Sequence, residues 1–198
     1  MEELASFLGC RGLRLSDKKK LSISLDIDGV LAEVHTPIIS EYNKRNALVG
    51  RRADYTLSDY TDYSWGSLGS SWSEIVHVYN HVWVRENHKI RLIADAKKIR
   101  ALADCYNVEL VTQKDDNTTV PATVQWIKRH GLDFLPLKVL LPCTDRCGLN
   151  YDIYIDDNPA VVERVRSKNG KVLLLVSNGA NRHIQECEGR SSLAISCA

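Results

Sequence analysis

Two aspartates one residue apart, Asp26 and Asp28, follow an apolar stretch near the start of the chain and precede Gly29. The stretch before them alternates apolar and polar residues as a half-buried strand does, and residues i and i+2 of a strand point to the same side. Both carboxylates should therefore face one point at the carboxyl end of the strand, where open α/β sheets bind ligands. Two close like charges are costly unless a cation or a proton lies between them, and oxygen ligands suit Mg²⁺. A plain strand that ends in an Asp-Gly turn is the alternative interpretation.

Polar residues also follow two later apolar runs. Thr112, Gln113 and Lys114 end one predicted strand, and Asp156 and Asp157 end another. Because the carboxyl ends of neighbouring parallel strands lie at the same edge of a sheet, these groups can converge on the first two aspartates. Several carboxylates offer oxygen ligands to Mg²⁺, and a hydroxyl group with a nearby cationic side chain suits a phosphate.

The remaining chain alternates predicted strands with predicted helices, which favours an α/β fold: a Rossmann-like parallel sheet with helices on both faces. The predicted strands are residues 21–26, 108–112, 137–141, 151–156 and 171–176. The predicted helices are residues 91–105, a segment opened by Thr118 or Thr119 and closed by Gly131, and residues 159–167 with Asn158 as the cap.

The segment 32–89 differs in character, because it holds three of the four tryptophans and several tyrosines. Ser71 and Glu74 fit a capping box, which predicts that a helix begins there. Apolar residues then recur at helical spacing. The segment is therefore expected to be a helical insertion between the first strand and the rest of the sheet.

Bulk composition narrows the classes of partner and location. The 198 residues suffice for one domain, or for a core with a small insertion. Lys and Arg total 26 against 25 Asp and Glu, so no basic field indicates extended nucleic acid or an anionic membrane. No apolar run approaches the ~18 residues that a membrane span requires. The six scattered cysteines favour reduced thiols, and a cytoplasmic location is expected.

Several of these segments resemble known motifs in their order along the chain. The run from Asp26 to Leu31, Thr112 and the run from Ile155 to Pro159 resemble the first, second and fourth motifs of haloacid dehalogenase (HAD) superfamily phosphatases. Within that superfamily the chain is most similar to the 5'(3')-deoxyribonucleotidase family, which has related residues around 41–43 and an Asn-Arg element like that at 181–182. The resemblance covers about residues 21–184.

The resemblance implies a division of the chain. It gives an HAD-like core at residues 21–31 and 90–184 and a small helical cap at 32–89. Residues 1–20 show weak periodicity followed by charge and are expected to be a poorly ordered or loosely docked leader, and residues 185–198 a C-terminal tail. A cap of this kind excludes water and supplies specificity for the leaving group.

The resemblance also implies roles for the aspartates. Asp26 would attack phosphorus and form an aspartyl-phosphate, and Asp28 would act as general acid and then as general base. Mg²⁺ would be held by Asp26, by Asp28 through its backbone carbonyl, and by Asp156. Asp157 is a candidate for a further metal-shell or orienting group.

Phosphate-binding residues are expected from the second and third motifs. Thr112, the Gln113 amide and Arg146 would hold the phosphoryl oxygens. The third motif normally carries a lysine, whereas Arg146 is the natural occupant here, with Lys138 as a second candidate inside a predicted strand. Lys114 stands at a position where the family has arginine, after a glutamine instead of a small residue.

The aromatic residues of the predicted cap divide into two groups. Trp72, Tyr79 and Trp83 lie on one helical stripe and are expected to form the core of the cap. Trp65 and Tyr63 lie off that stripe, in a predicted loop, and are the candidates for contact with the substrate. Stacking of a base on such rings is worth about 1–3 kcal/mol in nucleic-acid sites.

The expected function is that of a Mg²⁺-dependent phosphomonoesterase acting on a small phosphorylated substrate, first of all a (deoxy)nucleoside monophosphate. The alternatives are an HAD phosphatase for another phosphorylated metabolite or a nucleic-acid end, and a non-catalytic domain that binds a nucleotide or a protein. No membrane and no extended nucleic acid are expected as partners, and a homodimer is among the expected assemblies.

Overall fold

The computed structural model describes residues 20–114, 117–141, 144–166, 172–178, 180–181 and 195–196. The predicted leader, except Lys20, and the predicted tail, except residues 195–196, lie outside this part of the chain. Arg182 of the expected Asn-Arg element also lies outside it.

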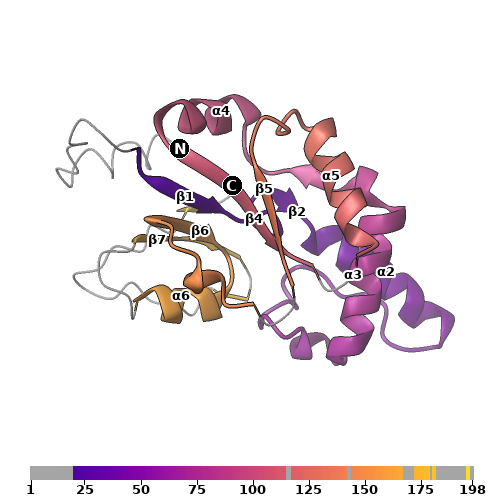
Figure 1. Ribbon diagram of the computed structural model, residues 1–198. Coiled ribbons are helices and arrows are strands. Elements are labelled where there is room, and N and C mark those ends of the chain that lie inside the picture. Colours follow the sequence, from indigo (N-terminus) through magenta and orange to yellow (C-terminus); the bar gives the residue numbers. More distant parts are fainter. Residues whose placement is uncertain are drawn as a thin grey trace.

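A six-stranded sheet with the order β5-β4-β1-β6-β7-β8 forms the centre of the fold, and its neighbouring strands pair in parallel (Figure 1). The strands are β1 (Ser22–Leu25), β4 (Asn107–Gln113), β5 (Leu137–Leu140), β6 (Ile153–Asp156), β7 (Val172–Ser177) and β8 (Ile195–Ser196). The predicted parallel sheet is therefore confirmed. The two-residue strand β8 was not predicted, since so short a segment carries no periodic pattern.

Helices lie on both sides of this sheet. They are α4 (Ala96–Cys105), α5 (Thr119–Arg129) and α6 (Pro159–Arg166), with α4 and α6 on opposite sides (Figure 1). The prediction of a helix over 91–105 placed its start five residues too early, because residues 91–92 form a short strand. The Asp95 side chain accepts a hydrogen bond from the Lys97 N–H at 2.8 Å and caps the helix at its true start.

The two ends of the insertion between β1 and the rest of the sheet lie side by side. Its entry strand β2 (Ala32–Glu33) pairs antiparallel with β3 (Arg91–Leu92), which brings the two ends together. Between them lie the helices α2 (His35–Leu48) and α3 (Trp72–Arg85) and the short 3₁₀ turns η1 (Gly66–Leu68) and η2 (Asn87–Lys89). A further turn, η3 (Arg146–Gly148), follows β5. We keep the name cap for the predicted segment 32–89.

The capping box at the start of α3 is confirmed. Ser71 Oγ accepts a hydrogen bond from the Glu74 N–H at 3.2 Å, and the Ser71 N–H donates to the Glu74 carboxylate at 2.9 Å. These bonds satisfy backbone donors that the first turn of a helix leaves free. The start of the main cap helix is therefore set by residues within one turn of it.

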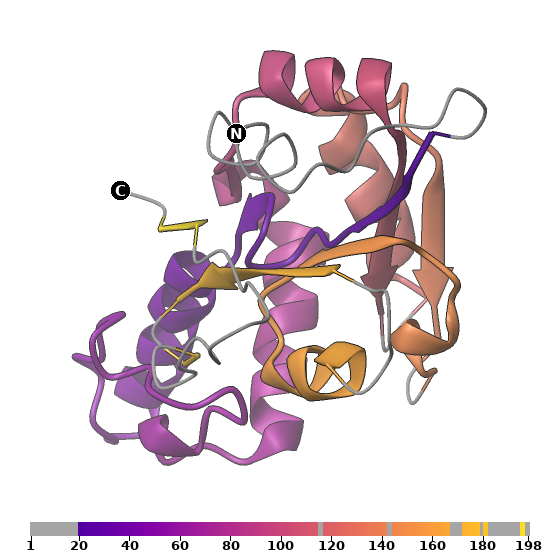
Figure 2. The same cartoon turned by 90° about the vertical axis from the view of Figure 1, so that its left-hand side faces the viewer.

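The cap packs against the core through two buried tryptophans. Trp83 of α3 and Trp126 of α5 are both fully buried, with ring centroids 6.1 Å apart in an edge-on arrangement. Trp126 Nε1 also donates a hydrogen bond to the Ile90 carbonyl at 2.9 Å, where the cap ends. These contacts hold α3 against α5, and α2 packs on α3, so that both cap helices lie beside the carboxyl edge of the sheet (Figure 2).

Candidate active site

Three buried carboxylates gather at the carboxyl edge of the sheet. Asp26 follows β1, and Asp156 and Asp157 end and follow β6, the neighbouring strand. Each of the three is at most 5% exposed, and one oxygen from each lies within 4.8 Å of the others. The parallel pairing sets this arrangement, because the Asp26 N–H donates to the Ile155 carbonyl at 3.0 Å.

Arg146 lies against this cluster and Lys138 does not. Arg146 Nη1 lies 3.0 Å from Asp26 Oδ1 and also forms an ion pair with Asp156. Lys138 instead contacts Glu109 and the Tyr151 hydroxyl, each at 3.3 Å, and 41% of its side chain is exposed. Of the two candidates for the third motif, only Arg146 is in a position to contact a phosphate beside Asp26.

A glycine allows the loop after β1 to approach Asp157. Gly29 has a φ of 75°, and a Cβ atom there would lie 2.0 Å from Asp157 Oδ2. The Asp157 carboxylate also accepts a hydrogen bond from Asn178 Nδ2 at 2.8 Å, and Asn181 Nδ2 donates to the Asp157 backbone carbonyl at 2.8 Å. The Asp-Gly pair therefore serves close packing at this edge as well as a turn.

Asp28 is held by three hydrogen bonds. Thr112 Oγ1 and Lys114 Nζ, at the end of β4, lie 3.1 Å and 2.7 Å from its Oδ2. Trp83 Nε1, from the cap helix α3, donates to its Oδ1 at 3.0 Å. The carboxylate for which the family resemblance implies acid-base chemistry is thus held from the core and from the cap at once.

Two of the buried carboxylates, those of Asp26 and Asp157, do not ionise easily in the absence of a cation. Burial raises the pKa of Asp26 to about 7; Arg146 opposes the shift, while Asp156 and Asp28 add to it. Burial also raises the pKa of Asp157 well above its usual value, with Asp26 and Asp156 acting in the same direction. A bound divalent cation would favour the ionised forms, as such a cluster requires.

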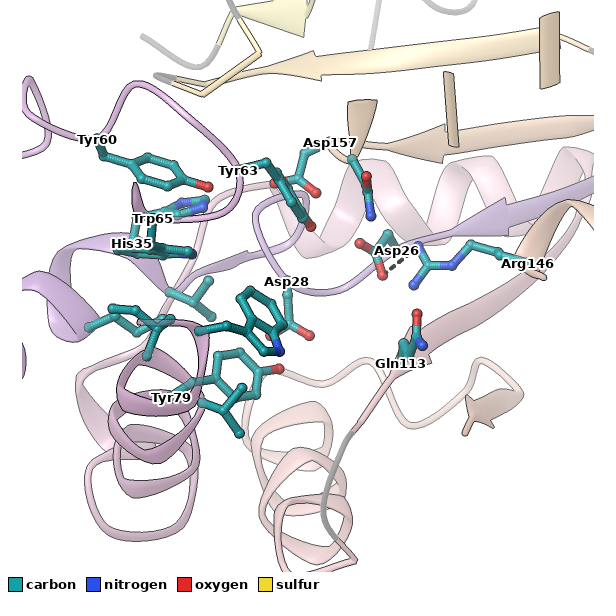
Figure 3. Close-up of a pocket in the computed structure, with 16 residues that line it drawn as sticks. Asp26, Asp28, His35, Tyr60, Tyr63, Trp65, Tyr79, Gln113, Arg146 and Asp157 are labelled. Carbon is teal, nitrogen blue, oxygen red and sulfur yellow. Dashed lines mark ion pairs between the residues drawn. The ribbon is translucent and has the colours of Figure 1, made fainter. Parts of the chain in front are cut away.

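A cavity of about 270 Å³ opens from the cluster toward the cap. Figure 3 shows Asp26 and Arg146 at one end of this pocket and Tyr60, Trp65 and His35 at the other. The ring of His35 packs against those of Tyr60 and Trp65, with centroids 4.9 and 5.9 Å away. The pocket therefore joins a charged end on the sheet to an aromatic end on the cap.

Both predicted substrate-contact residues line the pocket, and so does Trp72, which was expected in the core of the cap. Tyr63, Trp65 and Trp72 are all part of the wall. The prediction for Trp72 is wrong, because this first residue of α3 is 57% exposed. Of the three aromatic residues expected in the core of the cap, only Trp83 is buried in full. Tyr79 is partly buried and lines the pocket. At the first turn of a helix the apolar stripe extends past the packed core and onto the pocket rim.

The residues at the end of β4 differ in how they contribute to the site. Gln113 lines the pocket, whereas Thr112 is fully buried behind it with its hydroxyl on Asp28. The sequence placed Lys114 among the polar groups expected at this edge but gave it no role in the site. Trp83 was expected only in the core of the cap, and His35 was not singled out. A signal for Lys114 existed, since it stands two residues after Thr112 and alternate strand positions share a side.

The family is decided by comparison of the sequence with known proteins. A family profile described as 5' nucleotidase, deoxy (pyrimidine), cytosolic type C protein matches residues 19–194. The chain belongs to this nucleotidase family. It is therefore a hydrolase of the phosphatase class, as the resemblance in its motifs predicted. A search among curated proteins finds no match.

Solved structures share the fold of this nucleotidase at low sequence identity. A predicted phosphatase from Clostridium acetobutylicum has a TM-score of 0.58 at 11% identity, covering 82% of this chain and 88% of that one. A mutant of CbbY from Rhodobacter sphaeroides, in complex with xylulose-(1,5)bisphosphate, has a TM-score of 0.54 at 14% identity, with coverages of 87% and 92%. A haloacid dehalogenase-like hydrolase from Xanthomonas campestris has a TM-score of 0.51 at 15% identity, with coverages of 87% and 90%. These likenesses show the HAD-type fold.

The acidic cluster of the nucleotidase fits a hard divalent cation. Its three carboxylates offer oxygen atoms alone, which suits Mg²⁺. Asp157 Oδ1 is buried and has no hydrogen-bond partner within the part of the chain that the structure describes. A buried carboxylate oxygen without a hydrogen-bond donor is costly, and a bound cation would satisfy it.

A second group of potential ligands lies on the cap, formed by Glu41, His81 and Glu86. It is less suited to a metal, because Lys44 and Arg45 already pair with Glu41, and Lys44 also pairs with Glu86. These charges neutralise each other in a partly exposed network.

Within the described residues, no helix has the length and apolar character needed to cross a bilayer.

Proposed function

We propose that this nucleotidase is a Mg²⁺-dependent phosphomonoesterase that hydrolyses a small phosphate ester, first of all a (deoxy)nucleoside monophosphate, through an aspartyl-phosphate. One observation carries the proposal: Asp26, Asp156 and Asp157 converge beside Arg146 at the charged end of a pocket whose other end is aromatic. A phosphate fits the first end and a nucleoside the second.

Mg²⁺ would be held by the carboxylates of Asp26 and Asp156 and by the Asp28 backbone carbonyl, with Asp157 beside them. When bound, it supplies positive charge that lowers the repulsion between a carboxylate nucleophile and a phosphate dianion. Arg146 adds a second positive charge on the same side of the cluster, 3.0 Å from Asp26. Its planar guanidinium offers several donors to phosphoryl oxygens.

The chain's own residues would divide the reaction into two steps. A carboxylate oxygen of Asp26 forms a bond to phosphorus as the bond from phosphorus to the ester oxygen breaks, and Asp28 gives its proton to the departing oxygen. Asp28 then removes a proton from water, which attacks the phosphorus of the aspartyl-phosphate as the bond from phosphorus to the Asp26 oxygen breaks. Inorganic phosphate leaves, and both aspartates return to their starting forms.

Phosphate binding is proposed for Gln113 and Arg146, since both line the pocket. Thr112 has its hydroxyl on Asp28, so a direct contact with phosphate stays a prediction for that residue. A cavity of about 270 Å³ lies at the small end of ligand pockets, which favours a monophosphate over extended nucleic acid. Because the matching family is described as cytosolic, we place the activity in the cytoplasm.

The test is phosphate release from a panel of nucleoside monophosphates in ribo and deoxy forms, from sugar phosphates and from a generic aryl phosphate, with and without EDTA. The proposal expects turnover that EDTA abolishes and that the Asp26→Asn variant loses. The matched control is Asp133→Asn, an exposed aspartate in the loop before β5. A folded protein without turnover on any of these substrates would favour a non-catalytic binding domain and contradict the proposal.

A further inference from the structure

The side chain of Lys114 is fully buried although it ends in an ammonium group. Its Nζ lies 2.7 Å from Asp28 Oδ2 and 2.6 Å from the Tyr79 hydroxyl, and 4.0 Å from the ring of Trp83. Desolvation of an ammonium is costly, and buried ion pairs add little to stability compared with apolar residues of similar size. A lysine confined in this way points to a role besides holding the fold together.

The arrangement restricts the carboxylate of Asp28 rather than that of Asp26. Lys114 and Thr112, both from the end of β4, contact one oxygen, and the Trp83 N–H donates to the other from α3. A carboxylate bonded at both oxygens by donors from different elements cannot rotate without losing one of these bonds. Asp28 is therefore held in one orientation while it lines the pocket.

We infer that Lys114 and Trp83 are positioning residues that act through Asp28, holding its carboxylate where it exchanges a proton with the leaving oxygen. This inference rests on the proposed function, because that function gives Asp28 its acid-base role. Donors at both oxygens also stabilise the carboxylate that forms once Asp28 has released its proton. Since Trp83 belongs to the cap, the acid-base step depends on how α3 packs against the core.

Leaving-group dependence separates a positioning role from a structural one. The alcohol of a nucleoside monophosphate is a poor leaving group that needs a proton, whereas p-nitrophenol leaves readily as its anion. Correctly placed general acids contribute about 10²–10⁴-fold to such steps, so partial misplacement should cost about 10–100-fold. Damage to the fold would slow both substrates by the same factor.

The experiment compares Trp83→Phe and Lys114→Met with wild type, using the full chain with Mg²⁺. Rapid-quench measurement of the first turnover reports leaving-group release before water attacks the intermediate. We expect each variant to lose at least about ten times more rate with the nucleoside monophosphate than with p-nitrophenyl phosphate. The matched control is Trp126→Phe, which also removes a buried indole N–H but makes no bond to Asp28. It should slow the two substrates equally.

The same substitutions are then placed in an Asp28→Asn background. Residues that act through Asp28 should have little further effect on the first turnover of the nucleoside monophosphate once its acid-base function is gone. Equal losses with both substrates, or a full additional loss in the Asp28→Asn background, would overturn the inference and leave the proposed function intact. A wild-type protein that hydrolyses neither substrate, or an Asp28→Asn variant with wild-type rates, would overturn both.

Discussion

The two ends of the pocket are built by different means. At the sheet edge, Asp26 and Asp156 follow from the parallel pairing of β1 with β6, in which Leu25 lies beside Ile155. At the cap end, Tyr63 and Trp65 come from an irregular loop, and their placement depends on side-chain packing. Backbone register therefore positions the groups proposed for chemistry, whereas packed rings form the surface proposed for the leaving group.

This difference predicts different kinetic effects at the two ends. Substitutions at the sheet edge should lower kcat, because they remove charge that acts on the reacting phosphate. Substitutions at the aromatic end should raise KM for a nucleotide and leave the chemistry itself in place. Asp28 connects the two ends, since its hydrogen bonds come from β4 and from α3.

The largest effect is expected at Arg146. Arg146→Met removes the positive charge beside Asp26 and should lower kcat about 10²–10³-fold. Steady-state kinetics on a nucleoside monophosphate measures it. Lys138→Met is the control, because Lys138 lies on Glu109 away from the pocket and its loss should change kcat less than about twofold. The reverse ranking of the two variants would show that the third-motif role lies with Lys138.

A smaller effect is expected at Gly29. Gly29→Ala would press a methyl group against Asp157 and should weaken Mg²⁺ binding about 10–100-fold, as loss of a supporting contact around a metal ligand does. Calorimetric titration with Mg²⁺ measures the change. Gly50→Ala is the control, since Gly50 has a similar φ of 68° but an added Cβ would meet nothing within 4 Å. Equal weakening in both variants would mean that backbone strain, and not contact with Asp157, is the cause.

The aromatic end is tested at Trp72. Trp72→Ala should raise KM for a nucleoside monophosphate about tenfold, since a stacked base contributes about 1–3 kcal/mol. Inhibition by inorganic phosphate should stay the same, because phosphate alone does not reach the cap. Leu48→Ala alters another exposed apolar cap residue and serves as the control. Loss of kcat without a change in KM would contradict the division between the two ends.

The smallest effect concerns pH. Because the pKa of Asp26 is about 7 without a cation, protons and Mg²⁺ compete for its carboxylate. The apparent Kd for Mg²⁺ should therefore rise as the pH falls, by about threefold between about pH 7.5 and 6.5. Titrations at several pH values measure this slope, and Asp26→Asn should reduce it, with Asp157 left as the carboxylate of raised pKa in the cluster. An affinity that improves on acidification would contradict the burial of an ionisable carboxylate at this site.

Much of the fold could be predicted from the sequence because its signals are local. Strand periodicity and the capping box at Ser71 depend on neighbouring residues, and both predictions are confirmed. The start of α4 was misplaced, since Asp95 as a cap competes with an apolar pattern that begins earlier. The two residues of β8 carried too little pattern to be recognised.

In the site too, the residues fixed by local pattern could be predicted and those fixed by tertiary packing could not. Positions directly after strands could be predicted to share an edge, and the structure places Asp26 beside Asp156 there. The sequence could not predict that Trp72 lies exposed on the pocket rim while Trp83 is buried and donates a hydrogen bond to Asp28. Both residues lie on one helical stripe. Which part of such a stripe is covered depends on where the core ends, and that is set by tertiary packing.

The central claim is that Asp26 carries the phosphoryl group during turnover. The most direct measurement is rapid acid quench of the full chain with Mg²⁺ and a radiolabelled phosphate substrate, followed by mapping of the labelled peptide. The account predicts a hydroxylamine-sensitive label on Asp26 that forms before phosphate is released and is missing from Asp26→Asn. Phosphate release without a protein-bound label, or a label on another residue, would contradict it.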